Sequence, residues 1–414
     1  MAKEEKKAPK LRFNGYTNDW EQVKLGDVAE ITPGGTPSKN ISNSKNYTNN
    51  PRDNILVQGN ADLYNNRVLK RTFTTEVTKI ADRNDILISV RAPVGDIARN
   101  QYESIVIGRG IAAIKGNNFL YYQLEKMNNS GFWKKYIAGS TFESITGKDL
   151  KSSDIYISNH KEEKSIGDIF QTLTKTIQLH ERKCEELALI KKALLQKLFP
   201  KKDEFKPEVR YKNFSDAWEQ RKLGEVTEYI KGFAFKSKDY KKSGHRIIRV
   251  SDLGKDSIIN NNDSIFVTDE ISKQQNKYKI NKNEIIITTV GSKAELKESA
   301  VGRPIIVRNS LGYLLNQNLV KIHGKNNKDS RFIYYQLLQP RYSQYIATIQ
   351  RGNANQANIA ISDLWNYRIF ITKHNEQQKI GNFFQQLDFL ITLHQRKLEK
   401  LKQLKKFLLQ NMFI

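Results

Sequence analysis

The stretch HKEEKSIGDIFQTLTKTIQLHERKCEELALIKKALLQKLFP at residues 160–200 returns at residues 374–414 as HNEQQKIGNFFQQLDFLITLHQRKLEKLKQLKKFLLQNMFI. The two copies align without a gap, and roughly half of their positions are identical. Both begin with histidine, share an Ile-Gly pair in the second turn and carry Leu-Leu-Gln near the end. Repetition over this length indicates a duplicated element.

Both copies have the pattern of long helices, because their apolar residues recur at alternating steps of three and four, as in a coiled-coil seam. A narrow apolar stripe on a lone helix does not stay in water, so we predict that the two stripes pack against each other. The outer faces are rich in Glu, Gln, Lys and Arg, and we expect them to be solvated. Helices of about forty residues, at 1.5 Å per residue, reach roughly 50 to 60 Å. The predicted seam is Leu173, Ile177, His180, Cys184, Leu187, Leu194 and Leu198, with Leu387, Ile391, His394, Leu398, Leu401 and Leu408.

The repeat extends beyond the helices. WEQVKLG at residues 20–26 matches WEQRKLG at 218–224, and LYYQLEK at 120–126 matches IYYQLLQ at 333–339. Each half is therefore one globular unit followed by one long helix. Runs of β-branched residues predict strands, and short stretches with aromatic inner faces predict helices, which together indicate an α+β fold. The predicted strands are residues 85–90, 154–158, 284–290 and 367–372, and the predicted short helices are residues 120–127 and 332–339.

The charge balance points to a polyanionic partner. Lys and Arg number 69 against 44 Asp and Glu, a formal net charge of +25, which favours nucleic acid. A solvated charged surface and an anionic membrane face are the alternatives. No apolar run is long enough to span a bilayer, so a cytoplasmic location is expected. The single cysteine, Cys184, allows neither a disulfide framework nor a zinc framework.

Catalytic motifs are missing from the sequence. There is no GxxxxGK[ST] phosphate loop, no glycine-rich cofactor fingerprint after a strand and no Asn-Pro-Pro-aromatic run of the kind that amino-methyltransferases carry. The helix histidines lie twenty residues apart, a spacing that fits no helical metal pair. We therefore predict a chain that is not a complete enzyme and holds neither metal nor cofactor.

The loops between the matched segments differ, as expected of two binding modules with one architecture and two specificities. Lys and Arg contact phosphates, while Arg, Asn, Gln, Ser and Thr read base edges. For each single residue, a plain solvated role is the alternative. The predicted DNA contacts are Thr36, Ser38, Lys39, Arg91, Ser140 and Thr141 in the first unit, and Lys236, Lys238, Ser292, Lys293, Arg351, Asn353, Asn355 and Gln356 in the second.

WEQxKLG at the start of each unit, with IGxxF, HxRK and LLQ on each helix, resembles the specificity subunit of type I restriction-modification systems. The resemblance covers nearly the whole chain after residue 10. It implies that each unit is a target recognition domain reading one half of an asymmetric, bipartite site in double-stranded DNA. It also implies antiparallel helices that set the spacer between the half-sites.

The resemblance further implies that two modification subunits dock on the helices. Those subunits would carry methylation of adenine with S-adenosylmethionine, and restriction subunits using ATP and Mg would cleave DNA. For docking we predict the basic pairs Arg182 with Lys183 and Arg396 with Lys397. The rival function is a basic coiled-coil scaffold that binds RNA or anionic surfaces without DNA sequence specificity. The expected boundaries are a mobile leader 1–10, recognition domain 11–158, spacer helix 159–200, linker 201–210, recognition domain 211–372 and spacer helix 373–414.

Overall fold

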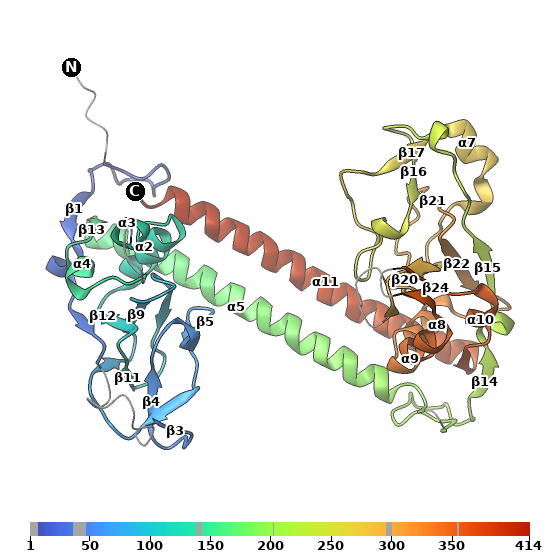
Figure 1. Cartoon of the computed structure of the whole chain (residues 1–414), viewed down its shortest axis with the longest axis horizontal. Coiled ribbons are helices and arrows are strands. Elements are labelled where there is room, and N and C mark those ends of the chain that lie inside the picture. Colours follow the sequence, from blue (N-terminus) through green and yellow to red (C-terminus); the bar gives the residue numbers. More distant parts are fainter. Residues whose placement is uncertain (1–6, 36–46, 138–142, 202, 295–299, 354–355) are drawn as a thin grey trace. The chain divides into compact units, whose positions relative to one another are not determined.

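The computed structural model describes residues 7–35, 47–137, 143–201, 203–294, 300–353 and 356–414. The chain divides into unit 1, made of Met1–Glu181 and Arg396–Ile414, and unit 2, made of Arg182–Gln395 (Figure 1). Helices α5 (His160–Lys197) and α11 (His374–Asn411) each contribute one part to each unit. The two predicted long helices are thereby confirmed. Within the described residues, no helix is long and apolar enough to cross a membrane.

Unit 1 is built from strands that form two main sheets and a small edge pair. The edge pair is antiparallel, with Glu21 opposite Ile157 and Lys24 opposite Asp154. One main sheet runs β2-β12-β9-β10-β6-β5 and the other β3-β7-β4-β11-β8. The bounds are β1 (Glu21–Lys24), β2 (Ile31–Pro33), β3 (Tyr47–Thr48), β4 (Asn54–Val57), β5 (Leu63–Tyr64), β6 (Arg67–Val68), β7 (Thr72–Thr74), β8 (Ile80–Asp82), β9 (Ile86–Ser89), β10 (Ile97–Arg99), β11 (Ser104–Ile107), β12 (Ile111–Ile114) and β13 (Asp154–Ile157).

Unit 2 repeats this plan with one strand fewer among the described residues. Its edge pair again places the first strand against the last, with Glu219 opposite Ile371. The main sheets run β15-β22-β18-β20 and β17-β16-β21, and a small sheet runs β19-β24-β23. The bounds are β14 (Glu219–Lys222), β15 (Thr227–Lys231), β16 (His245–Ile248), β17 (Ile265–Val267), β18 (Ile285–Thr288), β19 (Val290–Gly291), β20 (Pro304–Ile306), β21 (Leu314–Leu315), β22 (Leu319–Gly324), β23 (Arg351–Asn353), β24 (Gln356–Asn358) and β25 (Arg368–Ile371).

Short helices lie between the strands, and the predicted α+β mixture is confirmed. All the strands and short helices named from the sequence are present, with ends shifted by up to two residues. In unit 1 the helices are α1 (Leu25–Val28), α2 (Asn118–Asn129), α3 (Lys134–Ile137), α4 (Gly147–Lys151) and η2 (Asn60–Asp62). In unit 2 they are α6 (Leu223–Val226), α7 (Asp269–Gln274), α8 (Ser330–Leu337), α9 (Pro340–Ile349), α10 (Ile361–Trp365), η3 (Ser237–Asp239), η4 (Val250–Asp252) and η5 (Asn276–Tyr278).

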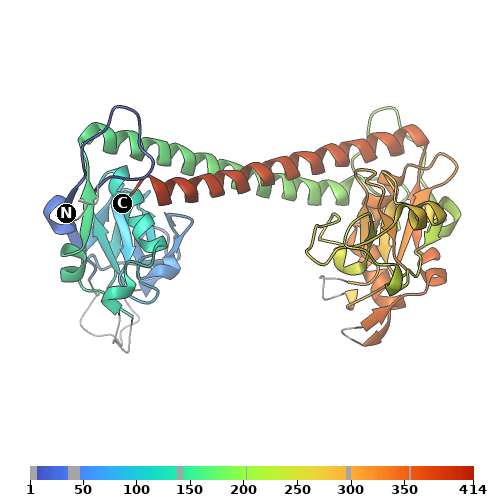
Figure 2. The same ribbon diagram turned by 90° about the horizontal axis from the view of Figure 1, so that it is seen from above.

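In unit 1 an aromatic cluster joins the long helices to the globular core. Trp20 packs on Phe119 with ring centroids 5.3 Å apart, and Phe119 packs on Phe413 at the same distance. Phe170, from the start of α5, lies 5.6 Å from Phe413. Because Phe413 follows the end of α11, the two helices run antiparallel where they meet this core, beside the sheets in Figure 2.

Unit 2 uses the same cluster. The ring centroids of Trp218 and Phe199 each lie 5.4 Å from that of Phe332, and the Phe199 ring stacks on the Phe384 ring with centroids 6.1 Å apart. Phe199 follows the end of α5 and Phe384 lies near the start of α11, so the helices are antiparallel in this unit too. The predicted seam residues Leu198 and Leu387 are buried here, as other members are in unit 1.

Besides the expected charged and amide residues, the outer faces of the two long helices carry several large apolar side chains that are exposed to solvent. The seam residues near the helix middles are only half-buried, although Leu187 and Ile391 pack against the core of unit 2 and Leu398 packs against the core of unit 1. The exposed apolar side chains are Ile169, Leu179, Leu189 and Ile190 on α5, and Phe389, Leu390, Leu393, Leu404 and Phe407 on α11.

A buried ion pair ties the chain entering each unit to the first turn of its long helix. In unit 1, Arg12 donates two hydrogen bonds to Glu162, at 2.6 and 2.8 Å, and Glu162 is fully buried. In unit 2, Arg210 donates to Glu376 at 2.7 and 2.8 Å, and Glu376 is fully buried. The Ser158 hydroxyl also donates a hydrogen bond to Glu162, and the Thr372 hydroxyl donates one to Glu376. Two-pronged contacts of this kind fix distance and orientation together.

The hydrogen bonds decide the charge of these groups. Burial alone would raise the pKa of Glu162, but the hydrogen bonds from Arg12 and Ser158 outweigh burial and lower that pKa. The hydrogen bond to Glu162 raises the pKa of Arg12, and the bond to Glu376 raises the pKa of Arg210. Both partners of the unit 1 pair are therefore ionised at neutral pH.

Replacing Arg12 by Ala should destabilise unit 1 by about 3–5 kcal/mol, because it leaves the buried Glu162 carboxylate without its counter-charge. Urea unfolding followed by tryptophan fluorescence measures the loss. The control is Arg83→Ala, since Arg83 forms an exposed pair with Glu103 and its loss should cost under about 1 kcal/mol.

The pH dependence of the Arg12→Ala effect has a defined sign. Since folding lowers the pKa of Glu162, its stabilising contribution is complete above its ordinary pKa of 4.5 and fades as the pH falls below that value. The stability difference between the parent protein and Arg12→Ala should therefore shrink in acid. Equal stabilities of the two at neutral pH would contradict this role of the pair.

Candidate nucleic-acid interface

Two exposed arginines lie together at the strand ends of unit 1. Arg91 follows β9 and forms a backbone bridge with Ser144, while Arg109 follows β11. Both line the same two clefts, of about 230 and 240 Å³. Both side chains are exposed, and no hydrogen bond or ion pair joins either of them to another described residue. The first cleft is also lined by Tyr47, Gln58 and Asn60.

Glycines allow this close approach of turns in unit 1. A Cβ on Gly110 would lie 2.2 Å from the carbonyl oxygen of Gln58, and one on Gly34 would lie 2.0 Å from that of Gly108. Any larger residue would force these segments apart. The Gln58 turn is itself fixed, because the Asp62 carboxylate accepts its backbone N–H at 2.8 Å. The glycines therefore set the Arg109 turn beside the Gln58 turn.

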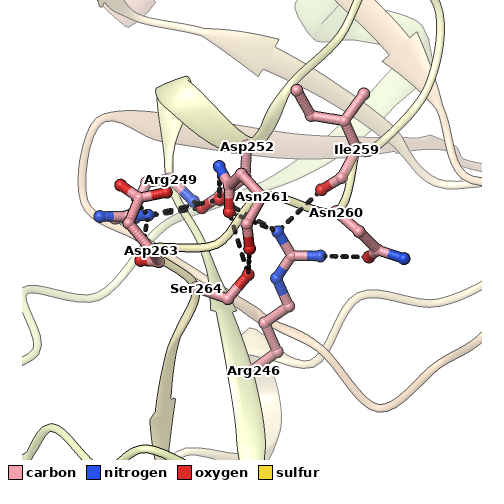
Figure 3. Close-up of polar contacts among 8 residues, drawn as sticks. All are labelled: Arg246, Arg249, Asp252, Ile259, Asn260, Asn261, Asp263 and Ser264. Carbon is pink, nitrogen blue, oxygen red and sulfur yellow. Dashed lines mark hydrogen bonds and ion pairs between the residues drawn. The ribbon is translucent and has the colours of Figure 1, made fainter.

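Unit 2 carries a larger polar network at the corresponding turn (Figure 3). The buried Asp252 carboxylate accepts hydrogen bonds from Arg246 at 3.0 Å, from the Arg249 side chain at 3.1 Å and from Asn261 at 2.8 Å. Burial opposes ionisation of Asp252, but the hydrogen bonds from Arg249 and Asn261 outweigh it and lower its pKa. Arg246 also donates to the side-chain oxygen of Asn260 at 2.9 Å.

This network shapes a polar cleft of about 650 Å³ in unit 2. Since Arg246 occupies the side-chain oxygen of Asn260, it directs the amide nitrogen of that exposed residue away from the guanidinium. Lys242 and His245 add positive or polar groups to the lining, and Tyr313 adds an aromatic ring. The arrangement suits hydrogen bonding to a polar anionic ligand.

Of the residues predicted from the sequence, the structure brings Arg91 into the unit 1 clefts. Lys236 and Lys238 are exposed at η3, while Ser292 and Lys293 are half-buried after β19. Arg351 is exposed and pairs with Asp363 at 2.7 Å. Asn353 and Gln356 face each other in the antiparallel pairing of β23 with β24. Thr36, Ser38, Lys39, Ser140, Thr141 and Asn355 lie outside the described residues.

Several polar residues of these sites escaped the sequence reasoning. They are Gln58, Asn60 and Arg109 in unit 1, and Arg246 with Asn260, Asn261 and Asn262 in unit 2. Two signals were available: the arginine enclosed by glycines in Gly108-Arg109-Gly110, and the run of three asparagines. Neither signal identifies the strand end to which its turn is attached.

The basic pairs predicted for docking are exposed on the long helices. On α5, Arg182 and Lys183 both contact Glu186, at 2.8 and 3.3 Å, so one carboxylate partly neutralises them. Exposed Leu179 precedes them, and exposed Leu393 precedes Arg396 and Lys397 on α11. Each basic pair therefore adjoins an apolar side chain on its own helix.

Within the part of the chain that the structure describes, no group of three or more His, Cys, Asp or Glu side chains is placed to hold a metal ion. The buried carboxylates of Glu162, Glu376 and Asp252 are occupied by arginines.

Comparisons with known proteins show which family has this architecture. The family described as type I restriction modification DNA specificity domain matches residues 17–189 and 215–403. The type I restriction enzyme MjaIX specificity subunit of Methanocaldococcus jannaschii is 25% identical over 94% of this chain and 92% of its own length. The putative MjaX specificity subunit of the same organism is 31% identical over 47% of this chain, and that match spans about half of the relative. The type I restriction-modification S subunit from M. genitalium shares the fold, with a TM-score of 0.68 and 16% sequence identity. The match covers 98% of this chain and 99% of that subunit.

The family matches cover most of the chain, once in each half. The chain therefore belongs to the type I restriction modification DNA specificity family, as the resemblance of its motifs indicated. Each matched stretch contains one globular part and most of the long helix that follows it.

Replacing Gly110 by Ala should destabilise unit 1 by about 1–3 kcal/mol, because the new Cβ would collide with the Gln58 carbonyl and displace the Arg109 turn. Gly59 offers a matched control, since a Cβ there meets no atom within 4 Å and its φ is extended. Gly59→Ala should change stability by less than about 0.5 kcal/mol. Urea unfolding of both variants compares them, and equal stabilities would mean that the turn adapts freely.

Proposed function

We propose that this chain is the non-catalytic, DNA-reading subunit of a type I restriction-modification complex, in which each unit reads one half of an asymmetric bipartite site. The observation that carries the proposal is that two equivalent backbones bear different exposed polar side chains. Unit 1 offers Arg91 and Arg109, while unit 2 offers the Asn260 loop and the paired strands β23 and β24. A shared backbone framework with different exposed polar side chains suits recognition of two different half-sites.

The charge of the chain supports duplex DNA as the ligand. A net charge of +25 favours a polyanion, and lysines such as Lys236 and Lys238 can neutralise phosphates. Phosphate contacts hold the protein without reading sequence, whereas arginine and amide side chains discriminate base edges in the major groove. Both kinds of side chain are exposed in the two units.

The long helices would set the distance between the half-sites. Each has 38 residues, so at 1.5 Å per residue each is about 57 Å long. A continuous helix is stiff compared with a loop, so its length would translate into a fixed number of base pairs between the half-sites.

The exposed apolar residues suggest where the modification subunits dock. Large apolar side chains grouped on one element mark protein-binding surfaces more often than free surface. We place the modification subunits on α5 and α11, over Leu179 and Leu393 and the basic pairs that follow them. Those subunits would supply methyl transfer from S-adenosylmethionine, and restriction subunits would supply cleavage with ATP and Mg.

Binding competition tests the proposed function. The purified chain with its modification subunits should prefer its bipartite duplex over a scrambled duplex at moderate salt, because base readout survives when phosphate contacts weaken. The complex should methylate adenines in that duplex, and the isolated chain should not. Binding that ignores DNA sequence, or methyl transfer by the isolated chain, would refute the proposal and, in the first case, favour the scaffold.

Lengthening both helices tests their role as a spacer. Inserting one heptad after Glu181 and another after Gln395 adds roughly 10 Å, which equals about three base pairs. The preferred spacer should grow by that amount, with both half-site sequences unchanged, as read by mapping methylated adenines. An insertion in α5 alone serves as the control, since it puts the seam out of register. Altered half-sites with an unchanged spacer would contradict the role.

A further inference from the structure

One turn occupies the same place in both units and carries a different polar side chain at its centre in each. In unit 1 it is Gly108-Arg109-Gly110, between β11 and β12. In unit 2 it is Asn316-Gln317-Asn318, between β21 and β22. We call these the reading turns. They differ in sequence at all three positions.

Hydrogen bonds show that the two reading turns are equivalent. Each is held by a matching set of backbone N–H to O=C bonds with the strands and turns around it. In unit 1 these are Gly108 to Val57 (2.8 Å), Ile111 to Gly108 (3.0 Å), Gly34 to Ile111 (2.9 Å), Val90 to Gly110 (2.9 Å) and Gly35 to Ile107 (3.0 Å). In unit 2 they are Asn316 to Ile248 (3.0 Å), Leu319 to Asn316 (3.1 Å), Gly232 to Leu319 (2.9 Å), Thr289 to Asn318 (3.0 Å) and Phe233 to Leu315 (2.9 Å).

A glycine makes the same close approach to both turns. A Cβ on Gly34 would lie 2.0 Å from the Gly108 oxygen, and one on Gly232 would lie 1.8 Å from the Asn316 oxygen. The residues that follow the turns, Ile111 and Leu319, are fully buried. Each reading turn is therefore fixed on both sides, and its central side chain is presented from a rigid support.

The central side chains of the two reading turns are exposed and make no polar contact with another described side chain. Arg109 and Gln317 are both exposed, while the residues that flank the turns on either side are buried. Neither has a polar side-chain partner among the residues that the structure describes. A polar side chain with unused hydrogen-bonding groups on a fixed backbone is suited to an external ligand, because the backbone of the turn loses little entropy when the side chain binds.

Chemistry distinguishes the two readers. The arginine fork donates two hydrogen bonds to O6 and N7 of guanine, whereas glutamine donates to N7 and accepts from N6 of adenine. A contact to phosphate would need no such difference, because phosphate offers acceptors alone. Exchange of a donor-only group for a donor–acceptor group at one position is expected when two different base pairs are read.

We propose that Arg109 and Gln317 are specificity-determining residues, Arg109 reading a guanine in the half-site of unit 1 and Gln317 an adenine in the half-site of unit 2. This inference rests on the proposed DNA-reading function. It adds which side chain of each unit makes an equivalent base contact and which base that contact selects.

The test uses the complete complex with its modification subunits, the variants Arg109→Gln and Gln317→Arg, and binding selection from a randomised duplex pool. Arg109→Gln should shift one position of the unit 1 half-site from guanine to adenine, with a change in preference of about ten-fold or more. Gln317→Arg should cause the opposite shift in the unit 2 half-site. In each variant the other half-site should stay as it is.

Exposed residues of the same types provide controls: Arg83→Gln in unit 1 and Gln274→Arg in unit 2 should leave both half-sites unchanged. Three results would overturn the inference while the parent complex keeps its bipartite preference: no change, uniformly weaker binding at every sequence, or a shift in the wrong half-site. A parent complex without any sequence preference would instead refute the proposed function. Circular dichroism confirms that the variants are folded.

Discussion

The buried arginine–glutamate pair at the base of each unit is the constraint on which the rest depends. Arg12 holds Glu162 and Arg210 holds Glu376, joining the chain just before each globular part to the first turn of the helix that follows it. The pairing of the first strand with the last strand closes the same junction. Each globular part is therefore an insertion whose two ends are fixed at one place.

Fixed ends leave the intervening loops free to vary. The core residues that support them are alike in the two units: a Trp and Phe pair on the globular side, and phenylalanines from the two long helices. Residues such as Arg109 and Gln317 lie on turns held by backbone hydrogen bonds, which do not depend on side-chain identity. An exposed residue on such a turn can therefore change without a change in the fold, which suits the two DNA specificities that we propose.

Sequence reasoning predicted the framework well, because the framework is written in apolar periodicity and in the repeat. The helices, the strands around Ile86 and Ile285 and the Tyr-Tyr-Gln helices all follow from such patterns. The candidate DNA-contacting residues were harder to predict. Arg91 could be predicted because it follows a predicted strand directly. Arg109 and the Asn260 loop line their clefts through long-range packing, which the local glycine and asparagine patterns do not specify. The exposed leucines of the long helices were missed because a seam pattern describes only the face that packs.

The central claim is that the two frames are equivalent and that each reads its half-site independently. Replacing residues 20–158 by a second copy of residues 218–372 would test it most directly, since both segments end beside the same Arg–Glu junction. Mapping of adenines methylated by the resulting complex should reveal a site with two copies of the unit 2 half-site sequence. A folded chimera that keeps the original asymmetric site, or that has lost all sequence preference, would contradict the account.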